Sequence, residues 1–309
     1  MDMHAVPFVD AHIHYWDLAK LRYPWLQPPF TSEGPNGSVE RIARTYLPGE
    51  YTAEASRWNV VGAVHIEAGA DPADAQSETV WLTQQQAVTG LPTAIVAYAN
   101  LADPEIDAVL ARQAAHATAR GIRQIVNWHP DARRSYSARD LTLDDAWQAG
   151  FAALGRHNLS FDLQCYPAQM PRIAELLAHY PTIPVVINHL GMPVVNDPDG
   201  LTEWRTGISA LAKLDHVSIK LSGLGFIDRE WDVEMTIPLI REVINLFGPG
   251  RSLAASDFPT DRLFAEFDRV MEALAQAVAV YNKDDRQLIW GGNACRFYGI
   301  DPAILGEVA

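Results

Sequence analysis

Short runs rich in Val, Ile, Leu and Phe alternate along the chain with longer segments in which apolar residues recur every three or four positions. The short runs predict eight strands, which span 8–14, 60–67, 93–100, 122–126, 160–165, 184–189, 216–222 and 252–257. Helical periods fall between them at 105–119, 143–157, 170–180, 201–214, 234–247 and 262–281. This alternation predicts βα units arranged around a parallel sheet.

Eight such units favour a closed (β/α)₈ TIM barrel over an open doubly wound sheet, which would carry a Gly-rich phosphate-binding turn after its first strand. The first strand runs instead into an aromatic and proline-rich stretch, 15–36, and a second irregular segment, 127–140, follows strand four. Its length and aromatic content make the first segment a candidate for a packed lid, although we assign no chemical role to Trp16, Trp25 or Trp128. We predict a single barrel domain over 1–309 with long loops after strands one and four.

Composition narrows the class of partner. The 309 residues include 24 Lys and Arg against 38 Asp and Glu, a net charge of −14, which argues against a nucleic-acid surface or a polybasic membrane contact. Cys165 and Cys295 are too few for a disulfide framework, and the chain shows neither a secretory leader nor an apolar run of the ~18 residues that cross a bilayer. We expect a cytoplasmic protein whose partner is a small molecule, and the oligomeric state stays open.

Polar side chains stand at the carboxyl end of nearly every predicted strand. His12 and His14 are two positions apart, so both rings face the barrel mouth, as a metal site or a polarising pair requires. The other strand ends supply His65 and Glu67, Arg123, Asp162 and Gln164, His189, Lys220 and Ser222, and Ser256 and Asp257. Burying so many polar groups without partners would cost several kcal/mol each, and barrel enzymes carry their active sites at these ends. Function therefore explains the set better than structure does.

Several blocks, in the right order, resemble one family. FVDAHIHYWD at 8–17, VHIE at 64–67, GIRQ at 121–124, FDLQ at 161–164, NHLGMP at 188–193, KLSG at 220–223 and SDFP at 256–259 are similar to the lactonase-like, amidohydrolase-related branch of the amidohydrolase superfamily. The likeness runs the length of the chain. It implies a (β/α)₈ barrel with the strand-one His pair, a strand-six His and a strand-eight Asp at the active site. Members of that branch open sugar lactones and 2-pyrone-4,6-dicarboxylate.

Two departures from the wider superfamily bear on metal binding. Binuclear members bridge their metals with a carboxylated lysine on strand four, but no lysine lies between Lys20 and Lys213. Strand five ends in Gln164 where metal-bearing members usually have a histidine. The resemblance therefore implies at most one divalent ion, zinc being the best match, held by three or four of His12, His14, His189 and Asp257. Metal-free operation is the second interpretation, and the sequence leaves both open.

Each candidate side chain has a chemical role and a structural alternative. Asp257 is predicted to be the general base, because a carboxylate near imidazoles can take a proton from water and pass it to an alkoxide. Its alternative is to cap the following helix, for which Asp261 is better placed. His189 is predicted to polarise the substrate carbonyl or to bind the metal.

Four polar residues are candidates for substrate binding: Arg123, Glu67, Gln164 and Lys220. Arg123 would hold a carboxylate or a hydroxyl with its planar fork, or would form an ion pair with Glu67 inside the barrel. Lys220 has a barrel salt bridge as its alternative. The sequence does not separate these interpretations.

The predicted activity is hydrolysis of a small lactone, derived from a sugar acid or an aromatic catabolite, by attack of water on the ester carbonyl. One alternative is metal-dependent, non-oxidative decarboxylation of an aromatic or muconate acid. Such enzymes usually take a metal ligand from strand five, where this chain has Gln164, so this activity is less favoured than hydrolysis. Another is a barrel that binds its ligand without turning it over.

Overall fold

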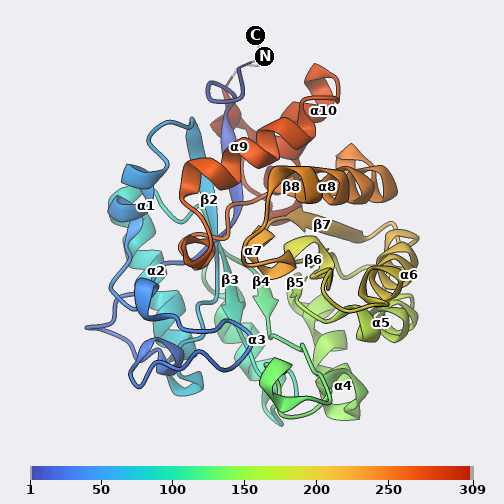
Figure 1. Cartoon of the computed structure of the whole chain (residues 1–309). Coiled ribbons are helices and arrows are strands. Elements are labelled where there is room, and N and C mark those ends of the chain that lie inside the picture. Colours follow the sequence, from blue (N-terminus) through green and yellow to red (C-terminus); the bar gives the residue numbers. More distant parts are fainter. Residues whose placement is uncertain (1, 307–309) are drawn as a thin grey trace.

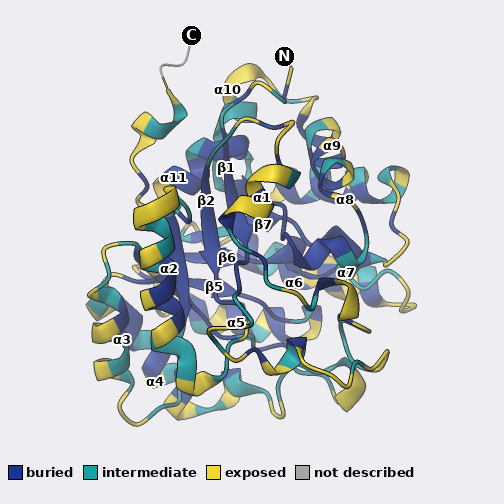
Figure 2. Ribbon diagram, turned by 90° about the vertical axis from the view of Figure 1, so that its left-hand side faces the viewer, coloured by how far each residue is buried: buried dark blue, intermediate teal, exposed yellow. Residues whose placement is uncertain are grey.

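The computed structural model describes residues 2–306, and within them eight parallel strands pair in sequence order around a central axis (Figure 1). The strands are β1 (Phe8–Ile13), β2 (Val60–Ile66), β3 (Ala94–Tyr98), β4 (Ala119–Arg123), β5 (Ser160–Leu163), β6 (Val185–Ile187), β7 (Val217–Leu221) and β8 (Ser252–Ala254). Their side chains are almost all buried, as expected for strands covered on both faces (Figure 2).

The sheet closes where β1 meets the segment that follows β8. Ile13 forms a parallel bridge with Phe258, the amide of Asp257 donates to the carbonyl of His12 at 2.8 Å, and that of His14 donates to the carbonyl of Phe258 at 2.8 Å. The predicted TIM barrel is confirmed. The closing seam also places the strand-one histidines directly beside Asp257, although Asp257 follows His12 by 245 residues in the sequence.

Helices surround the strands and shield their outer faces (Figure 1). In the described part of the chain they are α1 (Pro48–Glu54), α2 (Ala75–Thr89), α3 (Ile106–Ala114), α4 (Asp145–Ala153), α5 (Met170–Leu177), α6 (Gly200–Ala212), α7 (Leu224–Ile227), α8 (Val233–Phe247), α9 (Phe267–Val278), α10 (Lys283–Gln287) and α11 (Asn293–Tyr298). None of the helices within residues 2–306 is long and apolar enough to cross a membrane.

Several local predictions were wrong. The helix predicted over 105–119 ends at Ala114, because Ala119 pairs with Ile95 and starts β4, which in turn ends at Arg123 rather than 126. Pairing with a neighbouring strand overrides the helical period there. No helix was predicted at α2, because its many Gln and Thr side chains obscure its apolar face.

The helix predicted over 262–281 divides into a 3-10 turn, Thr260–Leu263, and α9. Glu266 occupies the N-cap position of α9, so Asp261 does not cap that helix as predicted and lies buried within the turn. The structure gives Asp257 no capping role either, because the N-cap of the turn is Pro259.

The two long irregular segments pack over the barrel mouth. In the first, Trp16 Nε1 donates to the carbonyl of Arg44 at 2.6 Å and Trp25 Nε1 donates to that of Ala68 at 2.8 Å. Tyr136, in the second, donates its hydroxyl to Asn36 Oδ1 at 2.5 Å and so ties the two segments together. Cys165 and Cys295 are free, buried thiols, as the absence of a disulfide framework predicted.

Candidate active site

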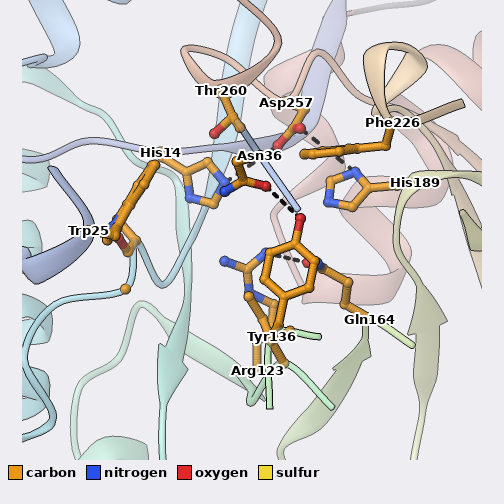
Figure 3. A pocket seen from close by; sticks show the side chains of 13 residues that line it. His14, Trp25, Asn36, Arg123, Tyr136, Gln164, His189, Phe226, Asp257 and Thr260 are labelled. Carbon is orange, nitrogen blue, oxygen red and sulfur yellow. Dashed lines mark hydrogen bonds and ion pairs between the residues drawn. The ribbon is translucent and has the colours of Figure 1, made fainter. Parts of the chain in front are cut away.

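A cavity of about 170 Å³ opens at the carboxyl ends of the strands (Figure 3). We call its strand-end residues the cavity floor: His14, Arg123, Gln164, His189 and Asp257. We call the residues that loops bring over it the cavity roof: Trp25, Asn36, Tyr136 and Phe226. Ala68, Gly69, Ile125 and Thr260 complete the lining.

Asp257 sits where the histidines converge. His12 Nε2 and His14 Nε2 are 3.2 Å apart, and each lies 3.4 Å from Asp257 Oδ1. The carboxylate is buried, yet neither oxygen accepts a hydrogen bond from any residue in 2–306. Burial raises the pKa of Asp257, against the lowering effect of His189, Arg123 and Lys220. Asp257 also adopts φ +59, in the left-handed region that few non-glycine residues occupy.

His14 presents an unprotonated nitrogen to this carboxylate. Its Nδ1 lies 2.7 Å from the carbonyl oxygen of Ile66, and because a carbonyl can only accept, Nδ1 carries the ring proton. Burial, and then the charge of Arg123, lowers the pKa of His14 to about 3. The neutral ring therefore offers the lone pair of Nε2 to a ligand or a proton donor.

His189 approaches Asp257 from the other side of the cavity, at the end of β6. Its Nδ1 lies 3.8 Å from Asp257 Oδ2 and 3.1 Å from the hydroxyl of Ser222. Its ring centroid is 4.7 Å from that of His12. Burial lowers the pKa of His189 to about 4, so this imidazole is also neutral. The imidazoles predicted from strands one and six thus meet around one acid.

Arg123 forms the ion pair that the sequence offered as its structural alternative, and its role in substrate binding stays a prediction. Its Nε lies 2.7 Å from Glu67 Oε1 and its Nη2 donates to the Glu67 carbonyl at 2.6 Å, which is the predicted internal ion pair. Its Nη1 reaches Gln164 Oε1 at 3.3 Å, and both side chains line the cavity. Glu67 lies behind the guanidinium and does not line the cavity.

Lys220 is placed beneath the cavity, where it does not line the space open to a substrate. Its Nζ lies 2.5 Å from Asp162 Oδ2 and 3.3 Å from His12 Nδ1, and all three side chains are fully buried. Burial lowers the pKa of Lys220 to about 8. The Tyr298 hydroxyl, 3.1 Å from both Asp162 oxygens, completes the cluster. The structure thus gives Lys220 the barrel salt bridge rather than the predicted position against substrate.

The cavity roof was missed by sequence reasoning. Asn36 and Tyr136 come from segments 100 positions apart, and Phe226 belongs to α7. Trp25 lines the cavity although no chemical role was assigned to it. The available signal was the unusual length and aromatic content of the two irregular segments, which marks a region but not the side chains that point inward.

The donor set fits a single metal ion. Ligand atoms of His12, His14 and Asp257 lie within 4.8 Å of one another, and the carbonyl bonded to His14 Nδ1 is the kind of outer partner that orients a metal-binding imidazole. His189, predicted as a further ligand, lies outside this group. Two cationic side chains also approach His12: Lys220 Nζ lies 3.3 Å from its Nδ1 and Arg123 Nη1 lies 3.4 Å from its Nε2. Only one nitrogen of the neutral ring has a lone pair to offer to either of them or to a metal ion.

Comparison with known proteins points in one direction. A family model described as amidohydrolase matches residues 9–300. An uncharacterized protein from Sinorhizobium fredii is 34% identical over 96% of this chain and 100% of its own length. An L-fucono-1,5-lactonase from Burkholderia ambifaria is 28% identical over 95% of this chain and 96% of its own. The crystal structure of an amidohydrolase from Burkholderia multivorans with bound zinc has a TM-score of 0.79 at 24% identity, over 95% of this chain and 99% of the other. Each likeness spans nearly the whole barrel.

Proposed function

The chain belongs to the amidohydrolase family, and from that premise we propose that it opens a small, neutral, hydroxylated lactone to a hydroxy acid. The observation that carries the proposal is Asp257, a buried carboxylate whose oxygens accept no hydrogen bond from residues 2–306. A buried acceptor left without a donor costs free energy, and such a cost is tolerated where a ligand supplies the donor. A water molecule held beside the cavity is the simplest one.

Asp257 takes a proton from that water as its oxygen attacks the ester carbonyl. The carbonyl oxygen becomes an oxyanion, which His189 and the Nη1 group of Arg123 stabilise in this proposal, since both line the cavity. The bond between the carbonyl carbon and the ring oxygen then breaks, and Asp257 returns its proton to the leaving alkoxide. The products are a hydroxyl group and a carboxylic acid, which ionises in solvent.

The polarity of the cavity favours an uncharged substrate. Arg123 is the one cationic side chain among the lining residues, and Glu67 already neutralises it. A lactone that bears two carboxylates would find no unpaired counter-charge among the lining residues. Asn36, Tyr136, Gln164 and Thr260 are instead neutral groups suited to hydroxyls, and the likeness to an L-fucono-1,5-lactonase supports the same class of substrate.

The Burkholderia multivorans structure is described as having zinc bound. His12, His14 and Asp257 are the residues that would hold a zinc ion in this chain. Bound there, a divalent ion supplies Lewis-acid polarisation of the carbonyl and lowers the pKa of water. Without it, the guanidinium of Arg123 and the ammonium of Lys220 keep positive charge within 3.4 Å of His12. Elemental analysis of the purified protein, with activity measured before and after chelation, distinguishes the two states.

A pH-indicator screen of aldonolactones tests the activity, with a pyrone dicarboxylate and a resorcylate-type acid in the same panel. We expect acid release from neutral aldonolactones and little from the dicarboxylate. Release of carbon dioxide from the resorcylate without ring opening would assign the chain to the decarboxylases instead. Binding of an aldonolactone without turnover would support the ligand-binding barrel.

A further inference from the structure

We propose that Ser222 is a positioning residue that fixes which nitrogen of His189 carries the proton, so that Nε2–H donates into the cavity. The proposal rests on the proposed function for its kinetic consequence only. The protonated nitrogen itself is a property of the folded protein and can be measured without a substrate.

The hydroxyl of Ser222 has one partner, His189 Nδ1 at 3.1 Å, among the hydrogen bonds of residues 2–306, and its side chain is fully buried. Two arrangements of protons are conceivable. If Nδ1–H donated to the hydroxyl, the serine O–H would be buried without an acceptor. If the serine O–H donates to Nδ1, every buried donor of the pair is satisfied, and the ring proton resides on Nε2. The second arrangement is therefore the more stable.

Asp257 does not reverse this assignment. Its Oδ2 lies 3.8 Å from His189 Nδ1, which is beyond hydrogen-bonding distance. The carboxylate would draw the proton to Nδ1 if the serine hydroxyl were removed. Ser222 thus holds the ring against the preference of its charged neighbour.

The backbone around the ring keeps Nε2 aimed at the cavity. His189 and Leu190 both have φ +55, and the ring lies against Gly223 of the β7 loop, where a Cβ atom would come within 2.6 Å of the ring's Cγ and Nδ1. The ring of Phe226 covers another side at a centroid distance of 5.2 Å. Figure 3 shows the ring edge opposite the Asp257 contact pointing into the open space.

The two neutral imidazoles that line the cavity then have opposite functions. The Ile66 carbonyl makes His14 Nε2 an acceptor, and the Ser222 hydroxyl makes His189 Nε2 a donor. An acceptor beside Asp257 suits the water, and a donor opposite suits the oxyanion. The Ile66 carbonyl, which bonds His14, and the Ser222 hydroxyl, which bonds His189, set this difference.

The test compares Ser222→Ala with Ser222→Thr, which keeps the hydroxyl, and with Ser252→Ala. Ser252, at the start of β8, is equally buried, but its hydroxyl donates to the carbonyl of Gly248. Nitrogen NMR of ¹⁵N-histidine-labelled protein reads the tautomer, with His189 assigned by its absence in His189→Gln. We expect a bare Nδ1 and a protonated Nε2 in the wild type, Ser222→Thr and Ser252→Ala, and a proton on Nδ1 in Ser222→Ala.

In the lactone assay, Ser222→Ala should lower kcat roughly 10- to 100-fold, the usual effect of losing an outer hydrogen-bond partner, with KM changed less than about 3-fold. Ser222→Thr should recover most of kcat, and Ser252→Ala should match the wild type. A wild-type spectrum with Nδ1–H, or a Ser222→Ala spectrum identical to the wild type, overturns the proposal. If no lactone is turned over, the spectra still decide it, so its failure is distinct from failure of the proposed function.

Discussion

The cavity floor and the cavity roof differ in origin and in burial. Every floor residue stands at or just beyond the end of a barrel strand and is buried, with at most 5% of its surface exposed. Every roof residue comes from a loop or a short helix and is only half-buried. The floor holds its groups by contacts between neighbouring strands, whereas the roof depends on contacts such as the bond between Tyr136 and Asn36.

From this difference we infer that bond making belongs to the floor, where Gln164 also contacts the substrate, and that the roof contributes mainly to substrate selection. Groups that move protons need positions fixed to a fraction of an ångström, which strand ends provide. Groups that recognise ring substituents tolerate more variation, which loops provide. Changes in the floor should therefore affect kcat or stability, and changes in the roof should affect KM.

The largest effect is expected from Asp257→Asn. The amide cannot accept the proton of the attacking water, so kcat should fall roughly 1,000-fold, within the usual contribution of general acid–base catalysis. Steady-state rates on the best aldonolactone measure it, with circular dichroism as a check on folding. A folded variant within about 10-fold of the wild-type kcat would remove Asp257 from the role of base and blur the distinction between floor and roof.

Arg123→Met tests whether the cavity floor also stabilises the folded protein. The change leaves the carboxylate of Glu67 buried without its partner, which should lower the free energy of unfolding by roughly 3 kcal/mol. Denaturant unfolding measures the loss. The double variant Glu67→Gln, Arg123→Met should recover part of it, because no unpaired charge remains. Equal losses in the single and double variants would show that the ion pair is not the cause.

Glu78→Gln tests the buried carboxylate that holds the backbone to which Trp25 of the cavity roof is bonded. Glu78 accepts a hydrogen bond from the amide of Ala68, and the carbonyl of Ala68 accepts one from Trp25 Nε1. Burial, and then the charge of Glu67, raises the pKa of Glu78 from 4.5 to about 8. The folded state thus holds a proton that the unfolded chain has lost. Stability is greatest below about pH 4.5 and declines as pH rises towards about 8.

Removing this carboxylate should flatten the decline of stability with pH. Because one pKa unit corresponds to about 1.4 kcal/mol, Glu78→Gln should be more stable than the wild type by a few kcal/mol above pH 8. Thermal melts across the pH range measure the difference. Glu175→Gln, which removes an exposed carboxylate on α5, serves as the control. A parallel pH dependence in all three proteins would contradict the assignment.

The smallest effect is expected from Tyr136→Phe in the roof. It removes a hydroxyl that bonds Asn36 and belongs to a residue lining the cavity. If this hydroxyl contacts the substrate as proposed, KM should rise about 2- to 10-fold, the value of one net hydrogen bond, with kcat nearly unchanged. Tyr166→Phe is the matched control, because its hydroxyl bonds the carbonyl of Arg134 outside the cavity. A loss confined to kcat would mean that Tyr136 belongs functionally with the floor.

The same division explains what the sequence could predict. The barrel and the floor follow from short-range regularities: strands alternate their side chains, parallel strands end at one face, and polar residues at those ends converge. His14, Arg123, Gln164, His189 and Asp257 were all named on that basis, and the structure places all five around one cavity. Their catalytic and binding roles stay predictions.

The roof and the outer partners do not follow from such regularities. The bond between Asn36 and Tyr136 depends on how two irregular segments fold against each other, and neither sequence pattern encodes that contact. The place of Lys220 below the cavity, rather than in it, depends on its distance along β7 and on the presence of Asp162 across the barrel. Ser222 was visible as a polar strand end, but its contact with His189 requires the coordinates.

Hydrolysis in ¹⁸O-labelled water tests the central claim most directly. Attack of water on the ester carbonyl under the control of Asp257 predicts that one heavy oxygen enters the carboxylate of the hydroxy acid in each turnover. The rate of labelling should fall roughly 1,000-fold in Asp257→Asn, in step with kcat. Label in the ring-derived hydroxyl, or labelling by Asp257→Asn as fast as by the wild type, would contradict the account.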